Sequence, residues 1–184
     1  MGVSIWIPSV VSFKLVPYSI RKIVWNQLLS TSFYAFVPGN ITFEIQGTKC
    51  SVTSNIETIS GDNIMVGIRT PVLPIGHKYL IMFEYETLIG SGITYVSVEG
   101  PTQMVRVSNI YEKKYAVILN GTQEATVFYF KPQGQKYVGD KWYFDKCQVF
   151  DLTKMFGSDA GIVSALGLSS TSEITANNGS KCNL

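Results

Sequence analysis

Apolar and polar residues alternate along most of this chain. In the stretch ITFEIQ, Ile41, Phe43 and Ile45 fall on one face of an extended strand, and polar residues fall on the other. The same period continues in NIMVGIR, KYLIMFEYET, ITYVSVE, TQMVRV, YAVIL, ATVFYFK and KWYFDKCQVF. Turn signals separate these stretches, among them PGN, GDN, PIG, GSG, NG and PQG. The pattern predicts an all-β protein, an antiparallel two-sheet β-sandwich resembling a jelly roll.

The period changes within the stretch KCQVFDLTKMFG. From Asp151 onward, Leu152, Met155 and Phe156 recur at the i, i+3, i+4 spacing of a helix. Asp151 is suited to cap this helix, and Gly157 is suited to end it in a left-handed conformation. About two turns are too short to be stable alone, so the apolar side chains must pack on the sandwich. These five residues are predicted to form a structural plug that covers one end of the sandwich.

Three regions follow from these patterns. Residues 1–25 form an extended N-terminal arm, because Pro8 and Pro17 make it a poor central strand. Residues 26–157 form the sandwich. Residues 158–184 begin with a short helix in DAGIVSALGL and continue as a polar tail.

Large apolar side chains in the arm need a cover. Trp6, Phe13 and Tyr18 are candidates for subunit contacts, because the arm of one chain could dock on a neighbouring copy. The competing interpretation is that the arm forms an edge strand of its own domain.

Composition narrows the class of protein. The chain has 184 residues with 46% hydrophobic content, enough for a full core. Its net charge is only +2 and no basic run occurs, so nucleic acid is not a predicted partner. The cysteines lack the spacing of a zinc site or a disulfide framework, and reduced thiols are expected at Cys50, Cys147 and Cys182.

No targeting or membrane segment is predicted. The apolar N-terminus lacks a basic region and contains Pro8, unlike a signal peptide. The segment YLIMFEYETLIG is too short to cross a bilayer and contains Glu84 and Glu86. A soluble protein without a membrane partner is expected.

The residues of a catalytic centre are not evident. The single histidine, His77, has no nucleophile motif beside it, and no phosphate, dinucleotide or metal motif occurs. Glu84 and Glu86 share a strand face at a spacing that superficially suits a glycosidase, but a solvated face is the simpler interpretation. The sequence predicts neither an enzyme nor a cofactor.

Aromatic residues are abundant, at 12% of the chain. Tyr129, Tyr137, Trp142 and Tyr143 gather toward the last strands. Planar rings beside polar groups can stack on sugar faces, fill a protein interface or pack in a core. Tyr137, Trp142 and Tyr143 are therefore candidates for glycan binding, with core packing and subunit contacts as the alternatives.

Three phrases carry a family resemblance: IVWNQLL (23–29), GHKYLIMFEYE (76–86) and QVFDLTKMFG (148–157). In this order they resemble a module common in tail-fibre, baseplate and other virion proteins of phages that infect gut bacteria. The match spans 26–157, and DLTKMFG is its most specific part. The family usually continues with AGNEP after MFG, whereas this chain continues with SDAG, so the downstream connection is expected to differ.

The resemblance implies two functions. The first is a virion structural protein of the tail, fibre or head, which assembles in the host bacterial cytoplasm with other virion proteins and with copies of itself, a trimer being one arrangement. The family is also similar in outline to carbohydrate-binding jelly rolls. The alternative is therefore a carbohydrate-binding module that recognises bacterial surface polysaccharide.

Overall fold

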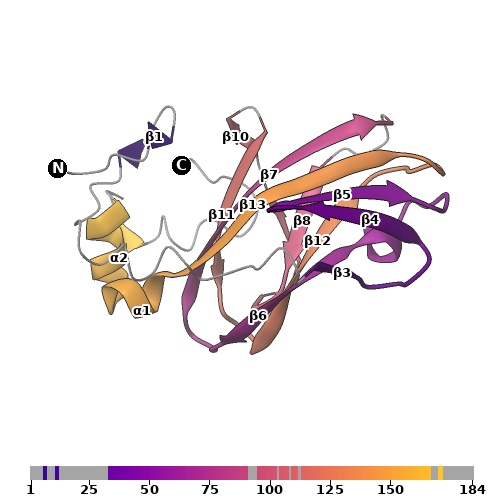
Figure 1. Cartoon of the computed structure of the whole chain (residues 1–184). Helices are drawn as coiled ribbons and strands as arrows, with labels where there is room; N and C mark the ends of the chain where they lie inside the picture. Colours follow the sequence, from indigo (N-terminus) through magenta and orange to yellow (C-terminus); the bar gives the residue numbers. More distant parts are fainter. Residues whose placement is uncertain are drawn as a thin grey trace.

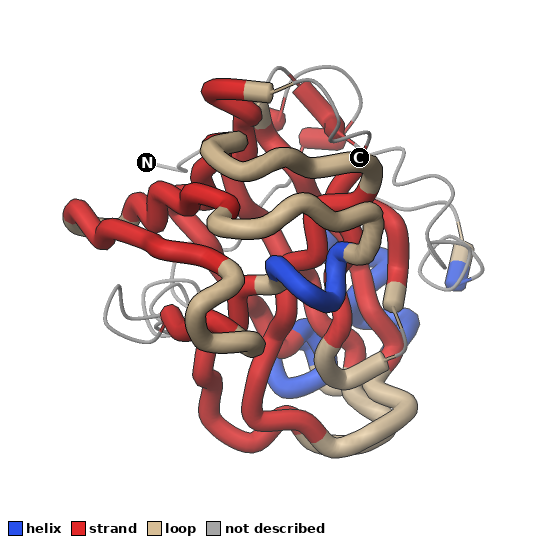
Figure 2. Tube along the Cα trace, turned by 90° about the vertical axis from the view of Figure 1, so that its right-hand side faces the viewer, coloured by secondary structure: helices blue, strands red, loops and turns tan. Residues whose placement is uncertain are grey.

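Two antiparallel sheets packed face to face make up the body of the protein (Figure 1). The computed structural model describes residues 6–7, 11–12, 33–90, 95–102, 104–107, 109–111, 113–166 and 170–171. Strands dominate both layers, and the helical turns are few and short (Figure 2). The predicted all-β, two-sheet sandwich is confirmed.

The strands are divided between a six-stranded and a five-stranded sheet. The larger has the order β10 (Asn109–Tyr111), β11 (Lys114–Asn120), β7 (Lys78–Ile89), β13 (Lys141–Asp151), β5 (Lys49–Ser54) and β4 (Ile41–Gln46). The smaller has the order β3 (Phe33–Ala35), β6 (Val66–Leu73), β12 (Ala125–Gln133), β8 (Tyr95–Glu99) and β9 (Val105–Val107). The chain crosses from one sheet to the other several times, as in a jelly roll. A 3₁₀ turn, η3 (Gly61–Ile64), precedes β6.

The main core lies between the two sheets. Along β7, Tyr79, Ile81 and Phe83 point inward at every second position, as the sequence period predicts. The ring of Phe83 meets that of Phe130 from the opposite sheet edge to face, with centroids 4.8 Å apart. Such a contact adds about 0.5 to 1.5 kcal/mol to the gain from burial.

A β-bulge interrupts the alternation in β13. Lys146 has a positive φ of 49°, and the register with β7 shifts between Asp145 and Gln148. Before the bulge Phe144 points into the core, whereas beyond it Val149 does so. The extra residue thus changes which positions face inward.

Two helices follow β13: α1 (Leu152–Phe156) and α2 (Asp159–Leu166). The Asp151 side chain accepts a hydrogen bond from the Lys154 backbone N–H at 2.8 Å, which caps α1. At the other end Gly157 has a φ of 76° and its N–H donates to the Thr153 carbonyl. Both predicted ends of this helix are confirmed.

The predicted plug covers the outer face of the six-stranded sheet instead of the opening between the two sheets. Leu152 is only 1% exposed and forms a second cluster with Ile162 of α2 and with outward positions of β7 and β11, which are Leu80, Ala116 and Ile118. These outward positions are apolar, so they need a cover that the opposite sheet cannot give. Met155 and Phe156 pack at the edge of the cluster and remain half-buried.

The N-terminal region contributes two short described strands. Strands β1 (Trp6–Ile7) and β2 (Val11–Ser12) pair in a small antiparallel sheet of their own. Trp6 lies in this pair, while Phe13, Tyr18 and the NQL phrase lie outside the described residues. None of the helices in the described ranges is both long and apolar enough to cross a membrane.

Candidate functional site

Two of the three family phrases meet in space. His77 Nδ1 lies 2.8 Å from Asp151 Oδ2, and the Lys78 backbone N–H donates to Thr153 Oγ1 at 2.9 Å. The ammonium of Lys78 also pairs with Asp159 of α2 at 3.0 Å. The start of β7 is thereby fastened to both helices. GHKY and FDLT thus form a structural joint, and they do not contribute to the aromatic surface described below.

The three residues predicted to bind glycan do not share a surface. Trp142 is 0% exposed in the main core, and Tyr143 is 7% exposed on the opposite side of the same strand. Successive residues of a strand point to opposite faces, so these two rings cannot form one platform. Tyr137 is 52% exposed in the turn between β12 and β13. The prediction of a joint platform is wrong, and Trp142 is a core residue.

Tyr143 is enclosed by charged side chains on the outer face of the six-stranded sheet. Lys49 Nζ lies 4.0 Å from the centroid of its ring. Burial, together with the neighbouring Glu86 carboxylate, raises the pKa of Tyr143. The ring therefore packs against these charged side chains and offers no open face to a ligand.

The two carboxylates that superficially resembled a glycosidase pair have separate cations. Glu86 lies 2.7 Å from Lys113, and Glu84 lies 2.9 Å from Lys146. The hydrogen bond from Lys113 lowers the pKa of Glu86. A general acid needs a raised pKa, and the pKa of Glu86 is shifted in the opposite direction.

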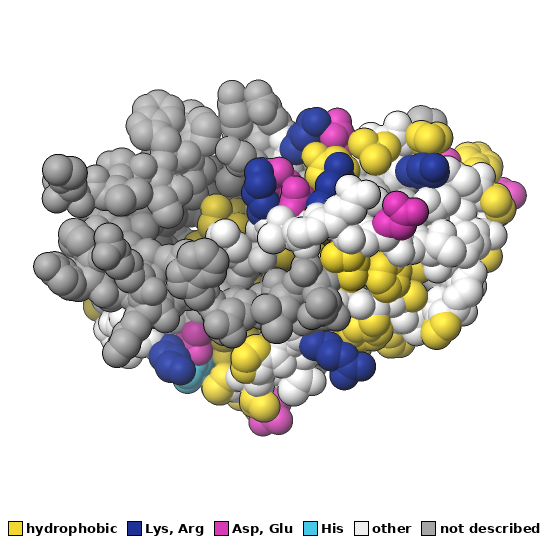
Figure 3. Space-filling view, viewed as in Figure 1, with side chains coloured by type: hydrophobic (Ala, Val, Ile, Leu, Met, Phe, Trp, Pro, Cys, Tyr) yellow, Lys and Arg dark blue, Asp and Glu magenta, His cyan; other side chains and the backbone are white. Residues whose placement is uncertain are grey.

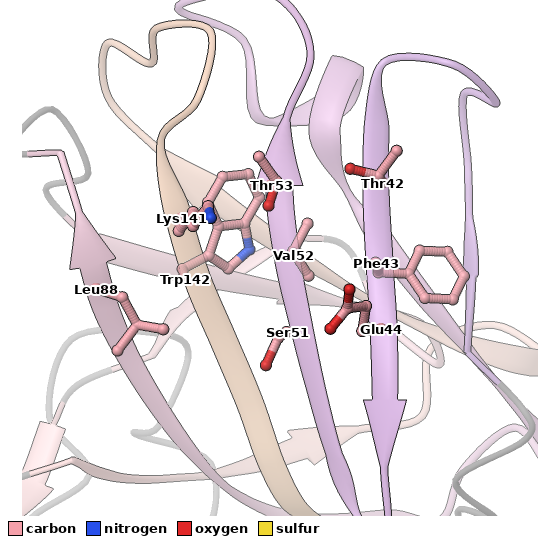
Figure 4. A pocket seen from close by; sticks show the side chains of 9 residues that line it. All are labelled: Thr42, Phe43, Glu44, Ser51, Val52, Thr53, Leu88, Lys141 and Trp142. Carbon is pink, nitrogen blue, oxygen red and sulfur yellow. The ribbon is translucent and has the colours of Figure 1, made fainter.

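A shallow groove lies on the six-stranded sheet (Figure 4). Its volume is about 160 Å³, and strands β4, β5, β7 and β13 supply its lining, which is Thr42, Phe43, Glu44, Ser51, Val52, Thr53, Leu88, Lys141 and Trp142. The two aromatic residues in this set pack with the main core. The groove is mainly a polar hollow and lacks a ring on which a sugar could stack.

The five-stranded sheet carries a different surface on its outer face. Three rings meet there, those of Tyr34, Phe36 and Tyr129, which we call the aromatic corner. Phe36 is 48% exposed, and its ring stands at 86° to that of Tyr129 with centroids 5.4 Å apart. The Tyr34 hydroxyl donates to the Tyr129 hydroxyl at 3.1 Å. Apolar side chains are visible on the surface in the region of β3 (Figure 3).

Gly67 makes room for the corner. It pairs with Tyr34 on one side and with Tyr129 on the other, so the three residues form one row across β3, β6 and β12. A Cβ at Gly67 would lie 2.5 Å from two ring carbons of Tyr34. The Tyr34 ring therefore lies across the glycine backbone, and any larger residue would displace it.

Charged groups flank the aromatic corner. The guanidinium carbon of Arg69 lies 5.2 Å from the centroid of the Tyr34 ring, in cation–π geometry. On the other side, Lys131 is bonded to both Asp62 and Glu99. Burial opposes the charge of Lys131, but the hydrogen bonds to these two carboxylates outweigh it and raise its pKa. The corner thus combines one exposed ring and two partly buried rings with charged groups of both signs.

Sequence reasoning found only part of this surface. Tyr129 belongs to the aromatic group near the last strands. Tyr34 lies in β3, 95 positions earlier in the sequence, and Phe36 directly follows that strand. In the sequence FYAF every position is apolar or aromatic, so the alternation does not reveal which rings point outward. Only the pairing of β3 with β6 brings the corner together.

Comparison with known proteins finds structural neighbours but no family. No protein-family model matches the sequence, and no curated protein matches it. Among solved structures, BiXyn10A CBM1 without ligand has 14% identity and a TM-score of 0.49 over 70% of this chain and 97% of its own. A CBM4 structure has 13% identity and a TM-score of 0.48, over 69% and 92%. The xylan binding module CBM86 of the gut symbiont Roseburia intestinalis has 8% identity and a TM-score of 0.46, over 66% and 90%. These structural neighbours are carbohydrate-binding modules, and with TM-scores below 0.5 they assign neither a family nor a ligand to this chain.

Proposed function

We propose that the protein is a non-catalytic carbohydrate-binding β-sandwich that holds a bacterial surface glycan against the aromatic corner. The observation that carries this proposal is the half-exposed ring of Phe36, which stands at a right angle to the partly buried ring of Tyr129 beside hydrogen-bonding groups. The C–H faces of a sugar are apolar and stack on a flat ring, while its hydroxyls need polar partners at the edge. Both kinds of group are present at the aromatic corner, where the ring of Phe36 packs against Tyr129 and the Tyr129 hydroxyl is bonded to that of Tyr34.

Each residue of the corner has a distinct role in this proposal. Phe36, the most exposed ring, stacks on the sugar, and Tyr129 borders it at a right angle. Tyr34 fixes Tyr129 through the hydrogen bond between their hydroxyls. Gly67 lets Tyr34 lie flat enough to make that bond.

Alanine variants test the site. Affinity electrophoresis of the whole chain in gels that contain bacterial surface polysaccharides should show retardation. Phe36→Ala and Tyr129→Ala should each reduce binding roughly tenfold, because each removes one stacking surface. Tyr137→Ala is the matched control, since it removes an exposed ring from another loop. Retardation lost in the control but kept in Tyr129→Ala would contradict the proposed site.

A second candidate function is that of a virion structural protein in a phage tail, fibre or head. It is favoured by the three family phrases in the sequence, two of which form the joint between β7 and the helices. In this proposal copies of the chain assemble with one another and with other virion proteins, and the aromatic corner serves in contact with the host surface. The mass of the purified chain in solution tests it. A stable oligomer that becomes monomeric when residues 1–19 are deleted is expected, and a monomeric whole chain would contradict it.

A further inference from the structure

Arg69 is an exposed cation beside the aromatic corner. It lies two residues beyond Gly67 on β6, so both positions face outward. It pairs with Val127, two residues before Tyr129 on β12, which places Arg69 and Tyr129 on a diagonal of about 7 to 8 Å between Cα atoms. Among the described residues, no carboxylate lies within ion-pair distance of its guanidinium.

The guanidinium is held in place without having its charge neutralised. Its contact with the Tyr34 ring restricts its position. A guanidinium offers donors in a planar fork that matches the two oxygens of a carboxylate. An arginine ordered by a ring and free of an ion pair is therefore prepared to bind such a group.

The tyrosine pair adds a second donor at the same place. The two hydroxyls share one hydrogen bond, so one of their two hydrogens is left for an outside acceptor. Tyr34 donates in that bond, so the hydrogen left for a ligand is that of the Tyr129 hydroxyl.

Lys131, a second cation on this face, is already paired. Lys131 lies 2.7 Å from Asp62 and is also bonded to Glu99. This cation is largely buried between its two carboxylates and is not available to a ligand. The cation that remains exposed at the corner is Arg69.

We infer that the glycan held at the aromatic corner carries a carboxylate, as uronic and sialic acids do, and that Arg69 binds this carboxylate while the rings contact the sugar. The inference rests on the proposed glycan-binding function and names its substrate class. A neutral sugar would leave the guanidinium without an anionic partner.

Matched pairs of ligands separate charge from ring contact. Isothermal titration of the whole chain would use oligogalacturonate, a hyaluronan oligosaccharide and sialyllactose, each beside its methyl ester, which has the same rings but no charge. At least one acid should bind about tenfold more tightly than its ester. Arg69→Gln should remove this difference and leave the affinity for the ester unchanged. Lys141→Gln, which removes an exposed cation of the six-stranded sheet, should leave the difference in place.

The outcomes distinguish the carboxylate preference from glycan binding itself. If every acid and its ester bind equally well, or Arg69→Gln weakens both alike, the carboxylate inference is overturned while glycan binding stands. An equal effect of Lys141→Gln would also overturn it, since net charge would then explain the preference. If neither the acids, nor the esters, nor the neutral polysaccharides bind, the proposed function fails and the inference fails with it.

Discussion

The outer faces of the two sheets differ in whether their apolar side chains are covered. On the six-stranded sheet, Leu80, Ala116 and Ile118 lie beneath helices α1 and α2, which the same chain supplies. On the five-stranded sheet, Phe36 stays about half exposed and packs edge to face against Tyr129. The difference teaches that apolar outward positions alone do not mark a binding face. The proposed binding face differs in having an apolar ring that the described part of the chain leaves half exposed beside ordered polar groups.

The strongest test of the covered face is the removal of its central side chain. Leu152→Ala should lower the free energy of unfolding by about 2 to 5 kcal/mol, since it opens a cavity beneath α1. Phe156→Ala should cost less, about 1 to 2 kcal/mol, because that side chain is only half-buried. Urea unfolding followed by circular dichroism measures both. Equal losses for the two variants would show that the helices bury both side chains to the same extent.

A substitution at the aromatic corner of the five-stranded sheet should have the reverse effect. It should weaken binding and change the stability little. Gly67→Ala places a Cβ against the Tyr34 ring and should break the bond between the two tyrosine hydroxyls. Retardation by polysaccharide should fall roughly tenfold, while the free energy of unfolding changes by less than about 1 kcal/mol. Ser51→Ala on the six-stranded sheet is the control. Undiminished retardation in Gly67→Ala would mean that Tyr34 does not position the corner.

The segment that connects β12 of the five-stranded sheet to β13 of the six-stranded sheet should make the free energy of unfolding depend on pH. Lys136, between β12 and β13, is fully buried, and burial lowers its pKa to about 8. The unfolded chain keeps the proton to a higher pH, so the stability of the folded state should rise as the pH increases above 8. Burial raises the pKa of the Cys50 thiol to about 12, and this effect lowers stability above about pH 9. Thermal unfolding of Lys136→Met should lack the rise between pH 8 and 9. A rise that persists in this variant would assign it to another group.

The smallest effect is expected at the ion pairs of the six-stranded face. Glu84→Gln removes the pairing with the exposed Lys146 and should change the free energy of unfolding by less than about 1 kcal/mol. Binding at the aromatic corner should not change, because the corner lies on the other sheet. Calorimetry and affinity electrophoresis check the two expectations. A large loss of binding would place the glycan on the six-stranded face.

The sequence predicts local features, such as helix ends, better than it predicts on which face of a sheet a side chain lies. The ends of α1 could be predicted from Asp151 and Gly157, because capping depends on residues within one turn. The location of Trp142 could not be predicted in the same way, because KWYF offers aromatic residues to both sides of its strand. The bulge at Lys146 then reverses the alternation without a distinctive sequence signal. The aromatic corner depends on strand pairing, which no local pattern encodes.

The position of β13 has a consequence for how the chain folds during its synthesis. This last strand lies between β7 and β5, so it separates the β10–β11–β7 half of its sheet from the β5–β4 half. While the ribosome is still making residues before Lys141, both halves expose an unpaired edge where β13 will lie, and such edges favour aggregation. Insertion of β13 then joins segments that are far apart in sequence, a step that is slow compared with the formation of a hairpin. A chain that stops before residue 141 should be insoluble even though it contains the whole aromatic corner.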